Sequence, residues 1–203
     1  MGSLNSCGAF WAFTSFLAAL SAAVGFYLPY WLQGSLQGTT VYFGVFRRCN
    51  YPHIASGSLT PVIVNECGRY ATFDDIPSLS WKIATITIGV GCGIALLVSF
   101  VAILAVCIDG VMSPTVARSA GIFQFCAGLL IGGGVALYPN GWDSPEVNQA
   151  CGNRSDAYVM GDCKFYWSFY LTAAGAGITI LWSLISCHAS HKKRSGPVPY
   201  TDI

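Results

Sequence analysis

The sequence predicts a bundle of four transmembrane helices that carries a small antiparallel β-sheet outside the membrane. Charged residues make up only 9% of the chain, against about a quarter in soluble proteins, and they avoid four apolar runs. Each run is at least as long as the ~20 residues that a helix needs to cross about 30 Å of hydrocarbon. Between the first two runs lies a segment rich in β-branched and aromatic residues that holds two cysteines. We therefore expect a single tetraspan domain, all-α within the membrane, with an ordered extracellular part.

The first apolar run covers about residues 9–28 and is followed by Pro29, Tyr30 and Trp31. Aromatic residues at the end of an apolar run are typical of a membrane interface. A cleaved signal peptide is the alternative, because small residues near Ala22 suit a cleavage site. The length of the run and the lack of Lys or Arg before it favour a membrane span.

Three further apolar runs predict spans at about residues 83–108, 119–138 and 165–187. The basic cluster Lys192–Arg194 follows the last span closely, and the positive-inside rule places this cluster in the cytosol. An even number of spans then puts both termini of a plasma-membrane protein in the cytosol. The segments outside the spans are two outer loops, 30–81 and 139–164, and a cytosolic tail, 188–203.

The nine cysteines divide by the side of the membrane on which each is predicted to lie. Four of them fall in the outer loops, where disulfides persist: Cys49, Cys67, Cys151 and Cys163. Four cysteines allow three pairings, and we expect Cys49–Cys67 and Cys151–Cys163 because each pair closes a short local loop. Cys107 and Cys187 lie where palmitoylation occurs, although a small buried hydrophobe is the more ordinary role.

Short runs in the first outer loop predict β-strands at residues 39–46, 59–64 and 69–73. These runs are rich in β-branched and aromatic residues, which are enriched in strands. Pro61 favours an edge position for the second run, because proline cannot donate to a central ladder. Hairpins this short are marginal in water, so a disulfide and packing on the helices must stabilise them.

The predicted spans contain no ionisable side chain in their interior, which argues against a pump or a proton-coupled transporter. Gln124 is the main large polar residue at depth, and we expect it to hydrogen-bond a neighbouring helix as a structural residue. We find no P-loop and no catalytic constellation, so we expect no enzyme, cofactor or metal site. The net charge of +1 offers no basic surface for nucleic acid.

Other features indicate sites of modification or of partner binding. Asn153 begins an Asn-Arg-Ser sequon in the second outer loop, a candidate for N-glycosylation. Glycines at 132–134 leave room for a partner helix, so a second copy of the chain is a candidate partner. Thr201 and the terminal Ile203 suit a PDZ domain, which captures a terminal carboxylate and pockets the last side chain.

Several motifs together resemble the lipoma HMGIC fusion partner-like tetraspans over residues 7–187. They are PYWLQG at 29–34, FGVFRRC at 43–49, ECGRYATF at 66–73 followed by Ile-Pro-Ser, and ALYPNGWDS at 136–144. The resemblance implies a claudin-like fold, with four helices and an extracellular sheet built mostly by the first loop. It also implies that Trp31 is a structural residue and that Cys49 and Cys67 match the disulfide of the claudin-like group.

The resemblance implies a function as well, because some relatives are auxiliary subunits of a mechanotransduction channel or of GABA-A receptors. We therefore expect an auxiliary or assembly subunit that binds another membrane protein, a channel or receptor, through its extracellular part. A claudin-like adhesion or junction protein is the alternative. Arg47, Arg48 and Arg69 are the candidate contacts, since Arg favours pairing with carboxylates at interfaces. Their alternative role is salt bridging within the loop.

Overall fold

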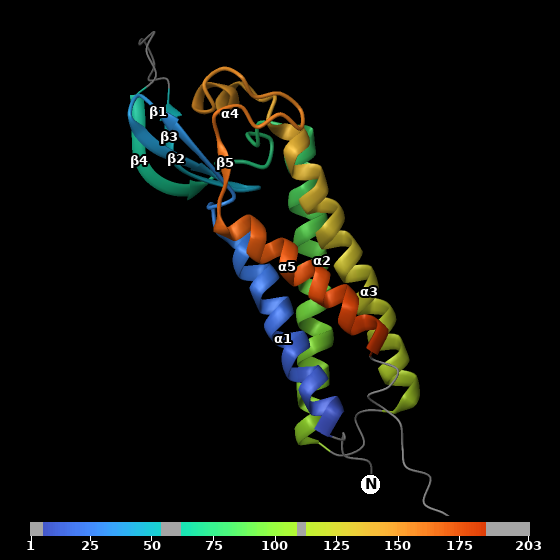
Figure 1. Cartoon of the computed structure of the whole chain (residues 1–203). Helices are drawn as coiled ribbons and strands as arrows, with labels where there is room; N and C mark the ends of the chain where they lie inside the picture. The colour runs from blue at the N-terminus through green and yellow to red at the C-terminus, as the bar shows by residue number, and fades with distance from the viewer. Residues whose placement is uncertain (1–5, 54–61, 109–112, 186–203) are drawn as a thin grey trace, which may run out of the picture.

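The computed structural model describes residues 6–53, 62–108 and 113–185, which form a helical bundle with a β-rich head at one end (Figure 1). Each helix of the bundle packs against two others, in the ring order α1–α2–α3–α5. All of them are long and apolar enough to cross a membrane. Their bounds are α1 Ser6–Tyr27, α2 Leu79–Cys107, α3 Pro114–Leu137 and α5 Trp167–Ile185.

Local capping decides where these helices begin. The Ser78 hydroxyl accepts a hydrogen bond from the Trp81 backbone N–H at 3.1 Å, so α2 starts ahead of its apolar run. The Ser113 hydroxyl caps α3 in the same way, with Pro114 in the first turn. In contrast, α5 starts after the predicted boundary at residue 165, because residues 164–165 pair with β1 instead.

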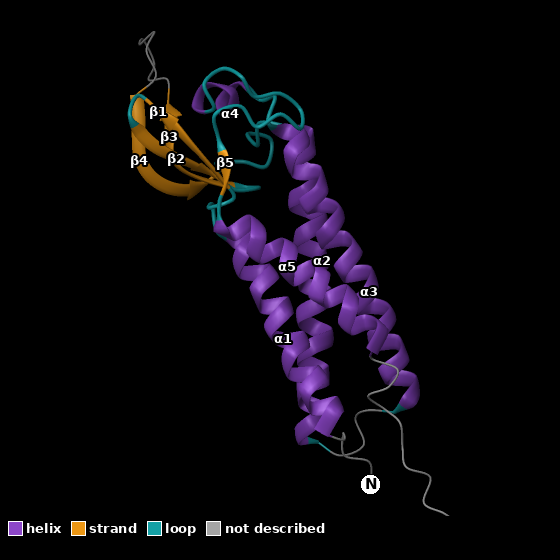
Figure 2. Cartoon of the chain, in the orientation of Figure 1, coloured by secondary structure: helices purple, strands orange, loops and turns teal. Residues whose placement is uncertain are grey.

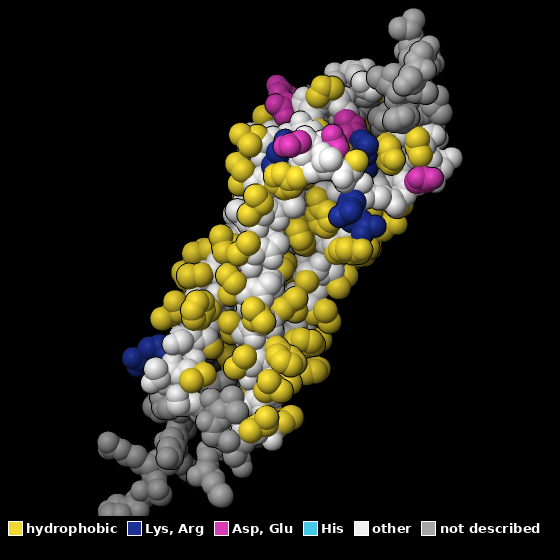
Figure 3. All heavy atoms as spheres, turned by 180° about the vertical axis from the view of Figure 1, so that it is seen from behind, with side chains coloured by type: hydrophobic (Ala, Val, Ile, Leu, Met, Phe, Trp, Pro, Cys, Tyr) yellow, Lys and Arg dark blue, Asp and Glu magenta, His cyan; other side chains and the backbone are white. Residues whose placement is uncertain are grey.

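Small residues let the helices approach closely inside the bundle. A Cβ atom added to Gly91 of α2 would lie 2.9 Å from the Ala127 carbonyl oxygen of α3. A Cβ atom added to Gly175 of α5 would lie 2.9 Å from the Ala18 carbonyl oxygen of α1. Many large apolar side chains are exposed instead, and they cover the bundle in Figure 3 while the charged side chains gather at its ends. A few, such as Trp11, Ile88 and Ile131, are buried between the helices.

The head contains a five-stranded antiparallel sheet in the order β4-β3-β2-β1-β5 (Figure 2). The first outer loop supplies all strands but the last. A two-residue turn at Gln37 and Gly38, both with positive φ, joins β1 to β2, as is common in tight hairpins. The strand bounds are β1 Leu32–Leu36, β2 Thr39–Phe43, β3 Arg47–His53, β4 Val62–Arg69 and β5 Lys164–Phe165.

The structure corrects the strand boundaries that the sequence predicts. Residues 69–73 do not form a strand beyond Arg69, because the Thr72 N–H and hydroxyl both donate to the Asp75 carboxylate and hold a turn. The strand at 47–53 was missed, since its arginines, Asn50 and Pro52 hide the β pattern. The predicted run at 59–64 lies partly outside the described residues, and its described part belongs to β4.

The second outer loop completes the head with a 3-10 turn, η1 (Tyr138–Gly141), and a short helix, α4 (Pro145–Ala150). The helix α4 packs against β1, and the two loops lie together at the same end of the bundle (Figure 1). The head is therefore a joint structure of both loops.

Candidate functional site

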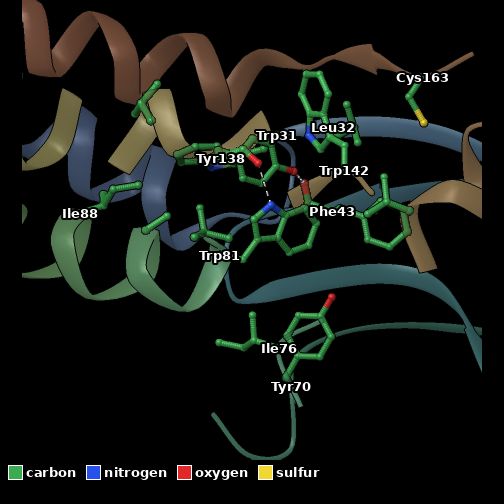
Figure 4. Close-up of a cluster of buried hydrophobic side chains, with 14 of the residues drawn as sticks. Trp31, Leu32, Phe43, Tyr70, Ile76, Trp81, Ile88, Tyr138, Trp142 and Cys163 are labelled. Carbon is green, nitrogen blue, oxygen red and sulfur yellow. Dashed lines mark hydrogen bonds between the residues drawn. The ribbon is translucent and has the colours of Figure 1, made fainter. Parts of the chain in front are cut away.

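Buried aromatic side chains fix the head to the bundle (Figure 4). The Trp81 and Tyr138 rings stack with centroids 4.9 Å apart, and Trp31 meets Tyr138 edge-on at the same distance. The Trp81 indole N–H donates to the Tyr138 carbonyl oxygen at 2.9 Å, and the Tyr138 hydroxyl donates to the Phe43 carbonyl oxygen at 2.9 Å. The Trp31 indole N–H donates to the Gly25 carbonyl oxygen at 2.8 Å. We call Trp31, Trp81 and Tyr138 the aromatic junction. Their two indole N–H groups and the Tyr138 hydroxyl are each hydrogen-bonded while buried, which makes this junction rigid.

Two disulfides brace the head within its loops. Cys49 of β3 and Cys67 of β4 lie directly opposite each other and are joined. Cys151 and Cys163 are joined across the second loop. Each bond limits the conformations of the unfolded loop, which stabilises a small sheet that has little core of its own.

Arg48 ties the two loops together. Its guanidinium forms an ion pair with the Glu146 carboxylate of α4 and lies 3.8 Å from the Tyr51 ring centroid and 4.5 Å from that of Tyr70. The Tyr70 hydroxyl donates to the same carboxylate at 3.3 Å. The Arg48 and Glu146 side chains are only 21% and 15% exposed. Arg48 therefore has the loop-internal role that was the alternative to partner contact.

Burial sets the electrostatics of this inter-loop tie. It raises the pKa of the Glu146 carboxyl above its ordinary value, against the opposing effect of the Arg48 charge. Burial also raises the pKa of Tyr70 well above its ordinary value, and the Glu146 charge adds to that rise. Tyr70 consequently remains a neutral hydrogen-bond donor at physiological pH.

Arg47 and Arg69 occupy the opposite side of the sheet from Arg48. They pair directly across β3 and β4, and successive strand residues point to opposite faces. The register places Tyr42 and Lys164 on the same side as this pair. We call this surface the basic face: Tyr42, Arg47, Arg69 and Lys164.

The charged side chains of the basic face form no ion pair with an acidic residue in the described part of the chain. Within the described residues, the ion pairs are Arg48–Glu146, Lys82–Asp74 and Arg154–Asp162. Arg47 lies over the Tyr27 ring, 4.4 Å from its centroid, and its buried Nε atom has no hydrogen-bond acceptor. Glu66 is the one acidic residue in the five strands, and it alternates with Cys67 toward the other side. The basic face therefore presents arginine and lysine side chains with no acidic residue of the five strands on the same side.

Gln124 is buried, and its side-chain N–H donates to the Ser15 hydroxyl of α1 at 3.0 Å. The contact joins α3 to α1, which is the kind of helix-to-helix bond that the sequence predicts for this residue. Its carbonyl oxygen has no partner among the described residues.

Some of the remaining predicted sites lie within the described residues and some do not. Asn153 is exposed in the second loop, but the Ser155 hydroxyl of its sequon is buried and donates to the Trp142 carbonyl oxygen at 2.7 Å. Cys107 is exposed at the end of α2. Thr201 and Ile203 lie outside the described residues, as does Cys187.

Comparison with known proteins decides the family. The family model described as "Lipoma HMGIC fusion partner-like protein" matches residues 7–192. The chain belongs to this family. LHFPL tetraspan subfamily member 2a protein of Danio rerio is 30% identical over 197 residues, which cover 88% of this chain and 84% of that protein. Member 3 of Danio rerio is also 30% identical, over 90% of this chain and 81% of that protein.

More distant lipoma HMGIC fusion partner-like relatives match over a similar extent. Member 5 of Gallus gallus is 27% identical over 90% of this chain and 79% of that protein. Together with the four apolar helices, this membership identifies a multi-pass membrane protein with a tetraspan fold.

Sequence reasoning missed the partners of Arg48. Glu146 follows Ser144-Pro145, which is only a helix-start signal, and Tyr70 sits in a run that was assigned to a strand. A cation in one loop and a carboxylate about a hundred residues away give no local pattern. A buried ion pair between the loops was therefore detectable only once both loops had been placed.

Proposed function

We propose that this protein is a non-enzymatic auxiliary or assembly subunit that binds another membrane protein, such as a channel or receptor, through the basic face. The head lies outside the cell and both termini lie in the cytosol in this proposal. Membership of the lipoma HMGIC fusion partner-like family supports it, because the resemblance of the sequence motifs implies that some relatives are channel subunits. The rigid aromatic junction also supports it, since a fixed head holds a docking surface at a constant height above the bundle.

The observation that carries the proposal is the position and composition of the basic face. Arg47 lies on Tyr27, the last residue of α1, so this face begins at the membrane boundary. Arg and Tyr are enriched at protein interfaces, and a pair of arginines without acidic partners suits carboxylates of a partner. A partner in the same membrane reaches this level more readily than a protein on a facing cell, which is the adhesion alternative.

The test reverses the charge of the basic face and measures binding apart from folding. We expect R47E/R69E to reach the cell surface with both disulfides formed but to lose its co-purifying membrane partners. The matched control is R154E, because Arg154 is also in the head but is 76% exposed and pairs with Asp162. Equal recovery of partners with the wild type, R47E/R69E and R154E would refute binding through the basic face.

Two further contacts belong to this proposal. The tail ending in Thr201 and Ile203 is proposed to recruit a PDZ scaffold, and replacing Ile203 with a charged residue would abolish that recruitment. A second copy of the chain is also a candidate partner, because a Cβ atom added to Gly132 or Gly133 would meet no atom within 4 Å.

A further inference from the structure

A cavity of about 190 Å³ lies beside Arg69, between the sheet and the start of α2. Its size is far above the ~10–15 Å³ that a single water molecule needs. Arg69 lines one part of this cavity, and Phe46, Phe73 and Ile76 supply apolar walls. The cavity therefore combines a cationic group with an apolar lining, which suits a ligand that has both an anionic and an apolar part.

The cavity extends from the head to the first turns of an apolar helix. Thr85 lines it as well and belongs to α2, which is one of the apolar helices, about 9 Å of helix rise beyond Leu79. Phe73, which lines the cavity, is 47% exposed. An aromatic residue at the end of an apolar helix marks the level of lipid headgroups, and the Tyr27 ring under Arg47 is such a residue.

Arg47 and Arg69 approach this boundary together. Like charges directly opposite each other on a sheet are destabilising, and these two have no acidic partner among the described residues. Two carboxylates in the segment that follows Arg69 have other partners, because Asp75 accepts hydrogen bonds from Thr72 and Asp74 pairs with Lys82. An anion between the arginines would relieve their repulsion and provide the acceptor that the buried Arg47 Nε lacks.

Phe46 connects the two arginines to the apolar wall. Its ring lies 4.9 Å from Phe26 and 6.3 Å from Tyr27, centroid to centroid, and it also lines the cavity. Arg47 therefore lies over Tyr27 at one end of a row of aromatic rings, and Phe46 of the same row lines the open cavity together with Arg69. This arrangement matches the two parts of a phospholipid: the arginines suit its charged headgroup, and the apolar surface next to them suits its acyl chains.

We propose that Arg47 and Arg69 bind the phosphate of a phospholipid in the leaflet next to the head, with its glycerol and upper acyl chain in the cavity. This inference shares with the proposed function only the premise that the basic face is a binding surface, and it does not require a protein partner. The two guanidinium groups have five N–H donors each, so they hold enough donors for a lipid phosphate and a partner carboxylate together. The lipid then forms part of the surface that a partner meets.

The test measures lipid retained by the full chain purified without any partner. Native mass spectrometry with phosphatidylglycerol should show saturable binding, and diacylglycerol, which lacks the phosphate, should bind at least about tenfold more weakly. The R47Q/R69Q variant should lose phosphatidylglycerol affinity by at least about tenfold. The control R154Q should keep it, because Arg154 lies outside the cavity and pairs with Asp162.

A second variant keeps the test decisive should R47Q/R69Q fail to fold. F73E adds a negative charge to a half-exposed wall of the cavity and should also weaken phosphatidylglycerol binding. Glycerol phosphate in solution should not displace the lipid at matched concentration. The proposal is overturned by equal binding of diacylglycerol, by displacement with glycerol phosphate, or by undiminished binding in F73E or folded R47Q/R69Q.

The lipid proposal and the partner proposal can fail separately. Tyr42 belongs to the basic face but does not line the cavity. Y42A should therefore reduce partner recovery and leave phosphatidylglycerol affinity unchanged, whereas F73E should reduce lipid affinity in the absence of any partner. Loss of lipid in Y42A would contradict the placement of the site at Arg69.

Discussion

At the scale of single residues, Arg47 and Arg48 are adjacent in sequence but make different contacts on opposite sides of the sheet. Alternation along β3 turns Arg48 toward α4, where it meets Glu146, and turns Arg47 toward Tyr27 at the membrane boundary. A charge pattern such as Arg-Arg therefore does not define one surface. The register of the sheet separates Arg48, which pairs with Glu146, from Arg47, which lies on the other side of the sheet.

Removal of Arg48 should destabilise the head, because it leaves the Glu146 carboxylate buried without a cation. Breaking a buried pair costs 3–5 kcal/mol, and partial exposure of this pair reduces the expected cost to about 2 kcal/mol. We expect R48A to lower the thermal midpoint in detergent by roughly 4–8 °C. E146Q keeps the hydrogen bonds in a neutral form and should cost less. An R48A variant as stable as the wild type would show that the Arg48–Glu146 ion pair does not contribute to the stability of the head.

The cost of R48A should also depend on pH. The pKa of Glu146 is raised in the folded state, so protonation favours folding, and this stabilisation is lost as pH rises through the folded pKa. Without Arg48 that pKa rises further. The difference in midpoint between R48A and the wild type should shrink as pH is lowered from 7 toward the ordinary carboxyl value of 4.5. A constant difference over that range would contradict this account of the burial of Glu146.

Sequence patterns predicted the residue types at these sites but not their pairing. Gln124 stands out in the sequence because it interrupts an apolar run, and its side chain is buried and bonded to Ser15. Glu146 gave no such signal, because a carboxylate in a loop is ordinarily solvated. The fate of Arg48 depended on a contact between distant loops, which no local pattern records.

At the scale of elements, glycine faces decide which helices approach each other. Gly175 and Gly177 lie on the same helix, but only Gly175 faces α1, where an added Cβ would lie 2.8 Å from the Ala22 Cβ. We expect G175L to force α1 and α5 apart, at a cost of about 1–3 kcal/mol. G177L is the matched control, since an added Cβ there meets nothing within 4 Å. Equal thermal midpoints for both variants would refute this packing.

The disulfides should hold the head more than the bundle. Replacing Cys49 and Cys67 with serine opens a loop with a sequence separation of 18 and should cost about 3 kcal/mol. Hydrogen exchange should then rise in β3 and β4, while α1 and α5 stay protected. Peptide mapping without reduction should recover Cys49–Cys67 and Cys151–Cys163 in the wild type. A Cys49–Cys151 peptide would contradict the arrangement of the head.

The elements were predicted as well as their local patterns allowed. Long apolar runs indicated the helices, whereas serine caps and the pairing of β5 moved their ends. The strand β3 was missed because its pattern is polar, and its place depends on Cys67 opposite Cys49 and on the membrane-proximal contact of Arg47. Strand pairing of this kind is a property of the folded head and not of the segment alone.

At the scale of the whole molecule, we expect both termini to lie in the cytosol and the head to lie outside the cell. Lys192–Arg194 should keep the tail in the cytosol, and an even number of spans should place the amino terminus there too. Tags at both ends should resist protease added to intact cells, whereas a tag inserted at Tyr158, an exposed residue of the head, should be cleaved. Cleavage of a tag at either terminus would contradict this orientation.

The tetraspan architecture was predictable because each apolar run can be recognised separately, from its own length and composition, as able to cross a membrane. The basic face was not, because it combines β2, β3, β4 and β5 from two loops. The function that we propose for this face concerns a partner outside the chain, so a measurement on cells tests it.

The most direct measurement places a photo-crosslinking residue at Tyr42 in cells whose proteins carry heavy isotopes, mixed with light cells. If the basic face binds within one membrane, the captured membrane protein carries only heavy peptides. Capture should fall in R47E/R69E, persist in R154E, and be absent when the photo-crosslinker is at Tyr158. Captured light peptides would show binding across cells, and equal capture from Tyr158 and Tyr42 would show that the basic face is not the docking surface.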